Sequence, residues 1–306
     1  FRRSGVDRDE ATRQRVQELR DELTRIGQEF GRSIKDDVRR IEVDAADLDG
    51  LPADWRRAHA PGPDGRVAVT TDATDYVPFM TYARSERARE ALWRLYRLRG
   101  HPRNLDVLAR MLARRAELAR VLGYPSWAAY VTEDKMIGSA EAAAGFVEKI
   151  ARAAEARMRR DFAQLLARKR VDAPGAERVE PWDSAYLQER VKAEQYDFDS
   201  QSVRPYLEYG RVKDGVLDTT ARLFGIVYRR VEGAPTWHPD VEVHDVLEEG
   251  RLLGRIHLDM FPRDGKYKHY AQFTLASGQA GVRLPEGVLV CNFPRPAPGA
   301  PALMEH

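Results

Sequence analysis

The chain has 306 residues, 43% of them apolar and 32% charged, and its 50 basic and 48 acidic side chains leave a net charge of only +2. This composition is that of an ordinary soluble protein, and the charge balance argues against a nucleic-acid-binding surface. The sequence contains neither an apolar run of about 20 residues that could span a membrane nor a signal segment at its start. Cys291 is the only cysteine, which rules out an intrachain disulfide and indicates a reducing, cytoplasmic location.

The first 225 residues show mainly helical periodicity. Asp7 and Glu10 form a variant of the capping box, and apolar residues then recur every three or four positions from Val16 to Ile41, which predicts a helix of about thirty residues. This helix could form a coiled-coil dimer or pack within its own domain. Further helix starts are predicted at Ser85, Asn104, Ser126 and Ser139, a helix end at Gly123, and a last helix at Gly215–Gly225.

The sequence period changes from about 3.6 to 2 at Ile226. Five strands are predicted at residues 227–231, 241–246, 252–260, 269–275 and 287–293, with turns at Glu249-Gly250 and Asp264-Gly265. We therefore predict a mainly α protein, with a long-helix body in residues 1–225 followed by a small antiparallel β-sheet and a proline-rich segment in residues 226–306. The last strand and the prolines after it are expected to expose apolar surface.

The stretch from Gly254 to Phe273 organises this region. Its first half alternates, and the apolar set is predicted to face the core: Ile256, Leu258 and Met260. Pro262 ends the strand, and Asp264-Gly265 is expected to turn the chain into a hairpin with the strand at 269–275. His257 and Asp259 share the opposite face, where they could hold a metal ion or simply be solvated.

This stretch also resembles a known family. Leu258–Tyr267, with the sequence LDMFPRDGKY and followed by His269, resembles the "LDLYPREGKYGH" segment of thimet-oligopeptidase-like zinc metallopeptidases. Other segments resemble the same family in the same order along the chain: Gly50–Asp54, Leu122–Val131, Trp237–Val241 and Asn292–Pro296.

The resemblance implies a two-lobed zinc peptidase fold with a deep channel, one wall of which is lined by the small sheet. It implies a zinc-dependent oligopeptidase that hydrolyses short unfolded peptides, and the form of the turn favours an endopeptidase over a dipeptidyl carboxypeptidase. In the family, two histidines of an H-E-x-x-H motif and a further glutamate bind the zinc. This sequence lacks the motif, which the family places shortly after the position of His306. We therefore expect the chain to be the N-terminal and central part of such an enzyme, inactive alone, with short peptides and the remainder of its catalytic domain as partners.

Within this resemblance, the strand that follows the turn is predicted to be an unpaired edge that receives the backbone of a peptide substrate. The predicted substrate-binding residues are His269, Tyr270, Ala271, Gln272 and Phe273, and no catalytic or metal-binding residue is assigned in this chain. His269 matches a family position, and it either contacts substrate or ties the turn to the strand by a hydrogen bond. The alternative from another class is a non-catalytic helical scaffold or peptide-binding protein.

Overall fold

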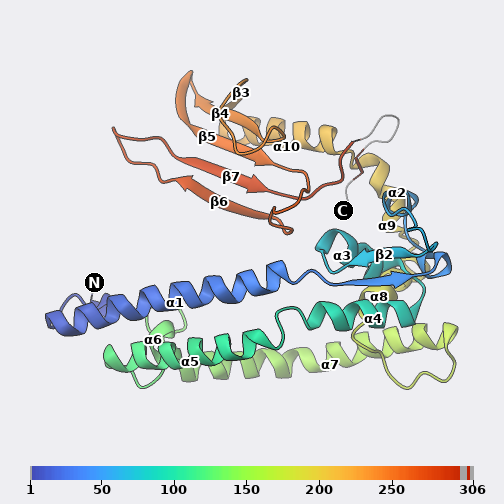
Figure 1. The fold of residues 1–306 in the computed structure, drawn as a ribbon, viewed down its shortest axis with the longest axis horizontal. Helices are drawn as coiled ribbons and strands as arrows, with labels where there is room; N and C mark the ends of the chain where they lie inside the picture. Colours follow the sequence, from blue (N-terminus) through green and yellow to red (C-terminus); the bar gives the residue numbers. More distant parts are fainter. Residues whose placement is uncertain (1, 297–301, 304–306) are drawn as a thin grey trace. The chain divides into compact units, whose positions relative to one another are not determined.

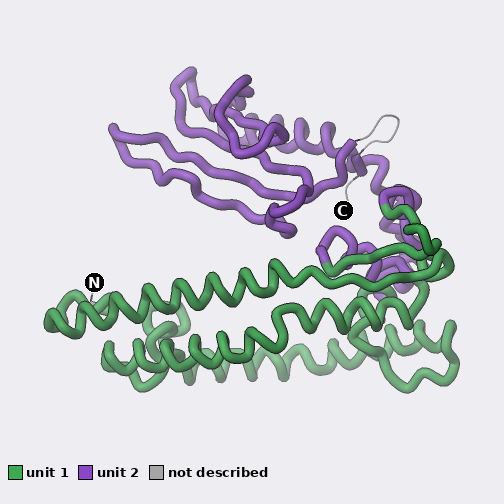
Figure 2. Tube along the Cα trace, viewed as in Figure 1, with its two compact units in different colours: residues 1–49, 59–71, 84–187 green, residues 50–58, 72–83, 188–306 purple. Residues whose placement is uncertain are grey.

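The structure is a computed structural model that describes residues 2–296 and 302–303. The chain forms two compact units, each assembled from separate parts of the sequence (Figure 2). Unit 1 contains residues 1–49, 59–71 and 84–187, and unit 2 contains residues 50–58, 72–83 and 188–306. The predicted separation of a helical body, 1–225, from a sheet region, 226–306, follows secondary structure rather than compactness, and it stays a prediction.

Unit 1 is built mainly of helices (Figure 1). Its elements are η1 (Arg2–Ser4), α1 (Glu10–Asp36), β1 (Arg40–Val43), η2 (Ala45–Leu48), β2 (Val67–Thr70), α4 (Glu86–Arg97), α5 (Arg103–Val121), α6 (Trp127–Thr132) and α7 (Ala140–Asp172). α1 packs against α5 through buried Val16, Leu19, Leu118 and Leu122. The first helix therefore buries its apolar stripe within its own unit.

Serine caps confirm three of the predicted helix starts. The hydroxyl oxygens of Ser85, Ser126 and Ser139 each accept a hydrogen bond from the backbone amide three residues later. Asn104 is not a cap, because it lies inside α5, where its side chain donates to the carbonyl of Phe30 at 3.1 Å. This bond links α5 to α1.

The two ends of α1 differ from the prediction. The helix begins after Asp9 rather than Asp7, because the Asp9 carboxylate accepts bonds from the amide and hydroxyl of Thr12 at 2.9 and 2.7 Å. It ends at Asp36, and Arg40–Val43 forms β1, paired antiparallel with β2. The helical spacing of the apolar residues continues to Ile41. However, the Asp37 carboxylate binds the amide of Gly100 at 2.8 Å, which fixes the turn after the helix.

Unit 2 contains a five-stranded sheet and its covering helix α10 (Figure 1). Its elements are α2 (Ala53–Ala58), α3 (Ala73–Tyr82), α9 (Ser200–Val203), η3 (Arg204–Tyr206), α10 (Tyr209–Phe224), β3 (Val227–Arg230), β4 (Glu242–Glu248), β5 (Arg251–Asp259), β6 (Ala271–Ala276) and β7 (Glu286–Val290). α8 (Ser184–Gln195) runs through the point at which the chain passes from unit 1 to unit 2. Glu249 and Gly250, with φ of 49° and 81°, form the predicted tight turn between β4 and β5.

The sheet is mixed rather than antiparallel, and its strand order is β3-β4-β5-β7-β6. The predicted hairpin between β5 and β6 is therefore wrong, because β7 lies between them, parallel to β5 and antiparallel to β6. Residues 260–270 are long enough to carry the chain past one strand. The apolar run of β7, with Val288 and Val290 buried, suits a central position, whereas Gln272 and Thr274 of β6 are exposed at the edge.

The last strand carries only part of the apolar surface predicted for it, because Leu289 is 38% exposed but its neighbours are buried. Val288, Val290 and Cys291 are buried, and the proline-rich stretch continues into residues 297–301, outside the described residues. Large exposed apolar side chains also lie on α5 and α7 of unit 1, among them Leu105, Leu112, Phe146, Ile150 and Phe162. Within residues 2–296 and 302–303, no helix combines the length and apolar character needed to cross a membrane.

A buried ion-pair cluster joins α4, α7 and the start of α8 in unit 1. The Asp183 carboxylate accepts hydrogen bonds from Arg89 at 3.0 Å and from Lys169 at 2.5 Å, and the side chains of Arg89 and Asp183 are 3% and 1% exposed. Lys169 also binds Glu86 at 2.9 Å. One buried carboxylate thus compensates two cations that are held away from water.

We expect Asp183→Ala to lower the free energy of unfolding by about 3–5 kcal/mol, because it leaves buried positive charge without its partner. Urea unfolding of the variant and the parent chain measures the difference. The matched control is Glu155→Ala, which removes an exposed ion pair with Arg159 at 2.6 Å and should cost no more than about 0.5 kcal/mol. Equal, small losses for both variants would contradict the role given to Asp183.

Candidate functional site

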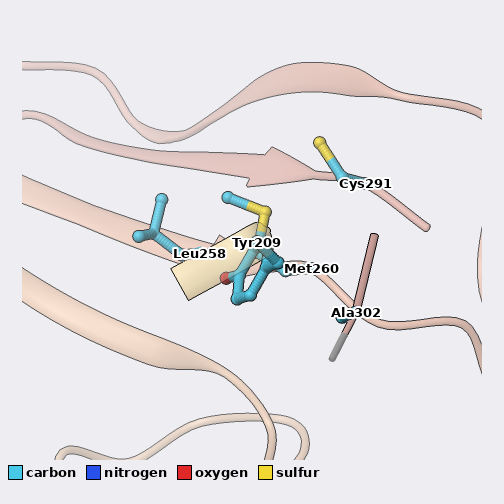
Figure 3. Close-up of a cluster of buried hydrophobic side chains, with 5 residues drawn as sticks. All are labelled: Tyr209, Leu258, Met260, Cys291 and Ala302. Carbon is cyan, nitrogen blue, oxygen red and sulfur yellow. The ribbon is translucent and has the colours of Figure 1, made fainter. Parts of the chain in front are cut away.

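The core-facing side of β5 is as the sequence predicts. Leu258 and Met260 pack with Tyr209, Cys291 and Ala302 in a buried cluster (Figure 3). Cys291 is a small residue of this core, and burial raises the pKa of its thiol, which disfavours the thiolate that a nucleophile needs. This packing holds the end of β5 and the end of β7 against the start of α10.

The opposite side of β5 ends in a carboxylate that is 2% exposed, that of Asp259. Arg263 binds both of its oxygens, with Nη1 at 2.7 Å from Oδ1 and Nη2 at 2.8 Å from Oδ2. The indole Nε1 of Trp237 donates to Oδ2 at 2.9 Å, and Nζ of Lys266 lies 3.0 Å from Oδ1. Such a fully bonded carboxylate holds its donors in fixed positions.

Lys266 extends this network into the backbone. Its buried ammonium donates to the carbonyls of Asp259, Phe261 and Cys291 at 2.9, 2.6 and 2.6 Å. These carbonyls belong to the end of β5, the segment that follows it and the residue after β7. A single side chain therefore ties together the two strand ends and the segment that leads toward β6.

Burial shifts the pKa values of Asp259 and Lys266 in opposite directions. Burial by itself raises the pKa of Asp259, but hydrogen bonds from Arg263, Trp237 and Lys266 outweigh it and hold that pKa well below its usual range. For Lys266, burial lowers the pKa, and the attraction of Asp259 offsets only part of this effect. The carboxylate therefore stays ionised at neutral and mildly acidic pH.

Asn292 fixes the last residues before β6. Its side-chain amide nitrogen donates to the carbonyls of Tyr267 and His269, both at 2.9 Å. The turn is therefore tied to the strand through the backbone carbonyl of His269, and not through its imidazole as one of the two predicted roles has it. The imidazole itself is exposed and contacts the rings of Tyr267 and Tyr270, with centroids 6.2 and 6.3 Å away.

The hydrogen bonds of β7 show which of its residues face β5. The amide of Cys291 donates to the carbonyl of Asp259 at 2.8 Å, and the amide of Arg255 donates to the carbonyl of Pro285 at 3.0 Å. The N–H and C=O groups of successive residues alternate sides along a strand. The backbone groups of the odd-numbered residues of β7 are therefore directed to β5, and those of the even-numbered residues are directed to β6.

This alternation assigns the backbone groups of β6. Ala271 is opposite Val290, an even-numbered residue, so the backbone of Ala271 and that of Phe273 are directed to β7. The N–H and C=O groups of Gln272 and Thr274 are directed to the other side. In the part of the chain that the structure describes, no strand pairs with β6 on that side, so these groups form an open edge.

The five residues predicted to bind substrate are contiguous at this edge. Ala271, Gln272 and Phe273 belong to β6, and His269 and Tyr270 precede it, with Tyr270 80% exposed. Their backbone groups differ in direction: those of Gln272 are directed to the open edge, whereas those of Ala271 are directed to β7. Their binding role stays a prediction.

His257 is neither solvated nor placed as a metal ligand. It is 5% exposed, stacks against Trp237 with ring centroids 5.5 Å apart, and its Nε2 lies 3.1 Å from a carboxylate oxygen of Glu286. His244 on β4 is buried as well, and burial lowers its pKa. Among the described residues, no group of three or more His, Cys, Asp and Glu side chains is arranged to hold a metal ion.

Sequence reasoning did not single out the residues that anchor the edge: Trp237, Arg263, Lys266 and Asn292. A signal for them was present, because all four lie in the segments that resemble the peptidase family. The structure brings these segments together, with Trp237 on Asp259 and Asn292 on the backbone of Tyr267 and His269. These four residues could have been identified from the fact that each lies in a segment that matches the family.

Comparison with known proteins identifies the class to which this arrangement belongs. A model of peptidase family M3 matches residues 79–306. The chain therefore belongs to peptidase family M3.

Curated relatives match most or all of the chain. Oligopeptidase A of Escherichia coli is 28% identical over 327 residues, which cover 100% of this chain and 48% of that protein. Organellar oligopeptidase A of Arabidopsis thaliana is 27% identical, over 98% of this chain and 41% of its own length. Dipeptidyl carboxypeptidase of Escherichia coli is 30% identical, over 81% of this chain and 37% of its own length. The chain thus spans about half the length, or less, of these relatives.

The lowered pKa of Asp259 predicts a specific loss of stability in acid. Above about pH 5 this carboxyl is ionised in both the folded and the unfolded chain, so its stabilising effect is fully present. As the pH falls below about 4, the unfolded chain takes up a proton that the folded chain resists, and the free energy of unfolding falls. Asp259→Asn should be less stable at pH 7 but lose less stability between pH 4 and pH 2.

Urea unfolding at a series of pH values checks this expectation. Glu155→Gln, a change at an exposed position, is the control and should follow the parent chain at every pH. An acid-induced loss in Asp259→Asn as steep as in the parent chain would show that Asp259 is not the group responsible.

Proposed function

We propose that the full-length protein is a cytoplasmic, zinc-dependent oligopeptidase that hydrolyses short unfolded peptides, preferably as an endopeptidase. In this proposal the chain supplies the strand edge that binds the substrate backbone. The observation that carries it is the open edge of β6, with the backbone of Gln272 and Thr274 directed outward, in a member of a peptidase family.

The edge suits a peptide that has no fixed fold. An extended peptide can add itself as another strand, using N–H and C=O groups that every residue possesses. Recognition through the backbone tolerates many sequences, and it requires a substrate segment free of its own secondary structure. The hydrogen bonds of Lys266, Asp259 and Asn292 hold the edge in place before a peptide binds, which reduces the conformational entropy lost on binding.

The described residues do not fit the zinc that the family resemblance implies. The imidazole of His257 and the carboxylate of Asp259 are engaged otherwise, since His257 binds Glu286 and Asp259 binds Arg263, Trp237 and Lys266. We therefore assign no metal ligand to them and place the zinc site in the remainder of the full-length protein. This chain's proposed part is to bind and orient the peptide.

The zinc part of the proposal predicts a difference between the full-length protein and this chain. The full-length protein should cleave a quenched-fluorescent peptide, lose that activity in a chelator and regain it with added Zn²⁺. The 306-residue chain alone should hold no stoichiometric zinc after dialysis and should be inactive. Metal analysis and the peptide assay measure both. Peptide binding by a full-length protein that never cleaves would instead favour the non-catalytic peptide-binding alternative.

The edge part predicts unequal effects of proline at two neighbouring positions. Gln272→Pro removes an N–H that points away from the sheet, so the fold should tolerate it, while peptide binding by the full-length enzyme should weaken by about 1–3 kcal/mol. Ala271→Pro removes a bond to β7 and should lower the thermal midpoint instead.

Gln272→Ala is the matched control, because it shortens the side chain and keeps the backbone donor. Steady-state kinetics and thermal unfolding separate the two effects. Unchanged kinetics for Gln272→Pro, in a protein that remains folded, would exclude this edge as the place where peptides pair.

A further inference from the structure

The open edge carries an aromatic pair on one of its two faces. Phe273 of β6 and Tyr267 pack edge to face, with ring centroids 6.1 Å apart and an interplanar angle of 75°. Both rings remain half exposed, at 46% for Phe273 and 45% for Tyr267. The backbone carbonyl of Tyr267 is held by Asn292, so this ring sits on a fixed segment.

The two faces of β6 differ in chemistry. Phe273 is opposite Val288 and shares a face with it, whereas Gln272 and Thr274 lie on the other face and present polar side chains. A peptide strand added at the edge alternates in the same way. Every second side chain of the peptide therefore lies on the same face of the sheet as the aromatic pair. The side chains between them lie on the face of Gln272 and Thr274.

The orientation of the backbone makes Phe273 the residue that such a peptide contacts most closely. Gln272 and Thr274 provide the edge hydrogen bonds, so Phe273 forms a non-hydrogen-bonded pair with the residue opposite it in an antiparallel addition. Side chains of such pairs approach with Cβ atoms about 4.5–5.5 Å apart. An aromatic ring at this distance contacts Phe273 directly.

We propose that Phe273, supported by Tyr267, is a specificity-determining residue that selects peptides with an aromatic or large aliphatic side chain at the position opposite it. This inference rests on the proposed substrate edge and adds to it. Backbone pairing provides general affinity, and one subsite on the aromatic face adds preference. The expected gain for an aromatic side chain over alanine is about 3- to 10-fold in kcat/KM.

A scan with peptides of one length tests the inference in the full-length enzyme. A single Phe is placed at each position in turn of an otherwise Ala- and Ser-containing quenched-fluorescent peptide. The wild-type enzyme should favour Phe over Ala by about 3- to 10-fold at one position near the cleaved bond. In Phe273→Ser this ratio should fall to about 1 at that position and stay unchanged elsewhere.

Two further variants guard against a loss of fold. Phe273→Leu keeps apolar bulk, so it should keep a preference for Leu at that position and lose most of the preference for Phe. Val282→Ser changes an exposed apolar residue outside β6, and it should retain the wild-type ratio. Thermal unfolding confirms that each variant is folded.

The outcomes separate this inference from the proposed function. If Gln272→Pro slows cleavage of all the peptides but Phe273→Ser keeps the wild-type preference, the aromatic subsite is excluded and the edge stands. If Gln272→Pro leaves all rates unchanged, the edge itself is excluded. A wild-type enzyme without preference at any position overturns the subsite directly.

Discussion

The geometry of the β6 edge depends on a buried ion pair, Lys266 with Asp259. Removing two charges from water costs several kcal/mol for each ion, and this cost is offset only because the remaining donors and acceptors are also bonded. Lys266 reaches three backbone carbonyls and Asp259 reaches Arg263 and Trp237. These bonds can form together only at one relative position of the strand ends, so the pair specifies a conformation more than it adds stability.

Local signals in the sequence predicted the elements of the fold well. Serine hydroxyls identified three helix starts, the alternation of Leu258 and Met260 identified the core face of β5, and the resemblance identified the peptidase family. The caps and the alternation lie within a few residues of the features that they predict, and each matched segment of the family is itself short. Capping, periodicity and motif similarity therefore need no knowledge of the remaining chain.

Features that depend on partners distant in sequence could not be read in this way. The Asp-Gly turn suggested a hairpin, but the apolar run of β7 takes the central place beside β5. The sequence places Ala271 beside Gln272 in one predicted site, but the register with β7 directs their backbone groups to opposite sides. His257 looked solvated because the residue that covers it, Trp237, comes from another part of the chain. In each case the deciding contact is one that only the folded chain brings together.

The division into units has a consequence for how this protein can be taken apart. The chain passes between the units after residues 49, 58, 71, 83 and 187, so neither unit is an uninterrupted piece of sequence. A single proteolytic cut leaves both units still joined by other crossings. For the same reason, no truncation at one point yields either unit whole, and a recombination event with one breakpoint cannot exchange one unit between relatives. The two units are therefore expected to be inherited, and to be engineered, as one piece.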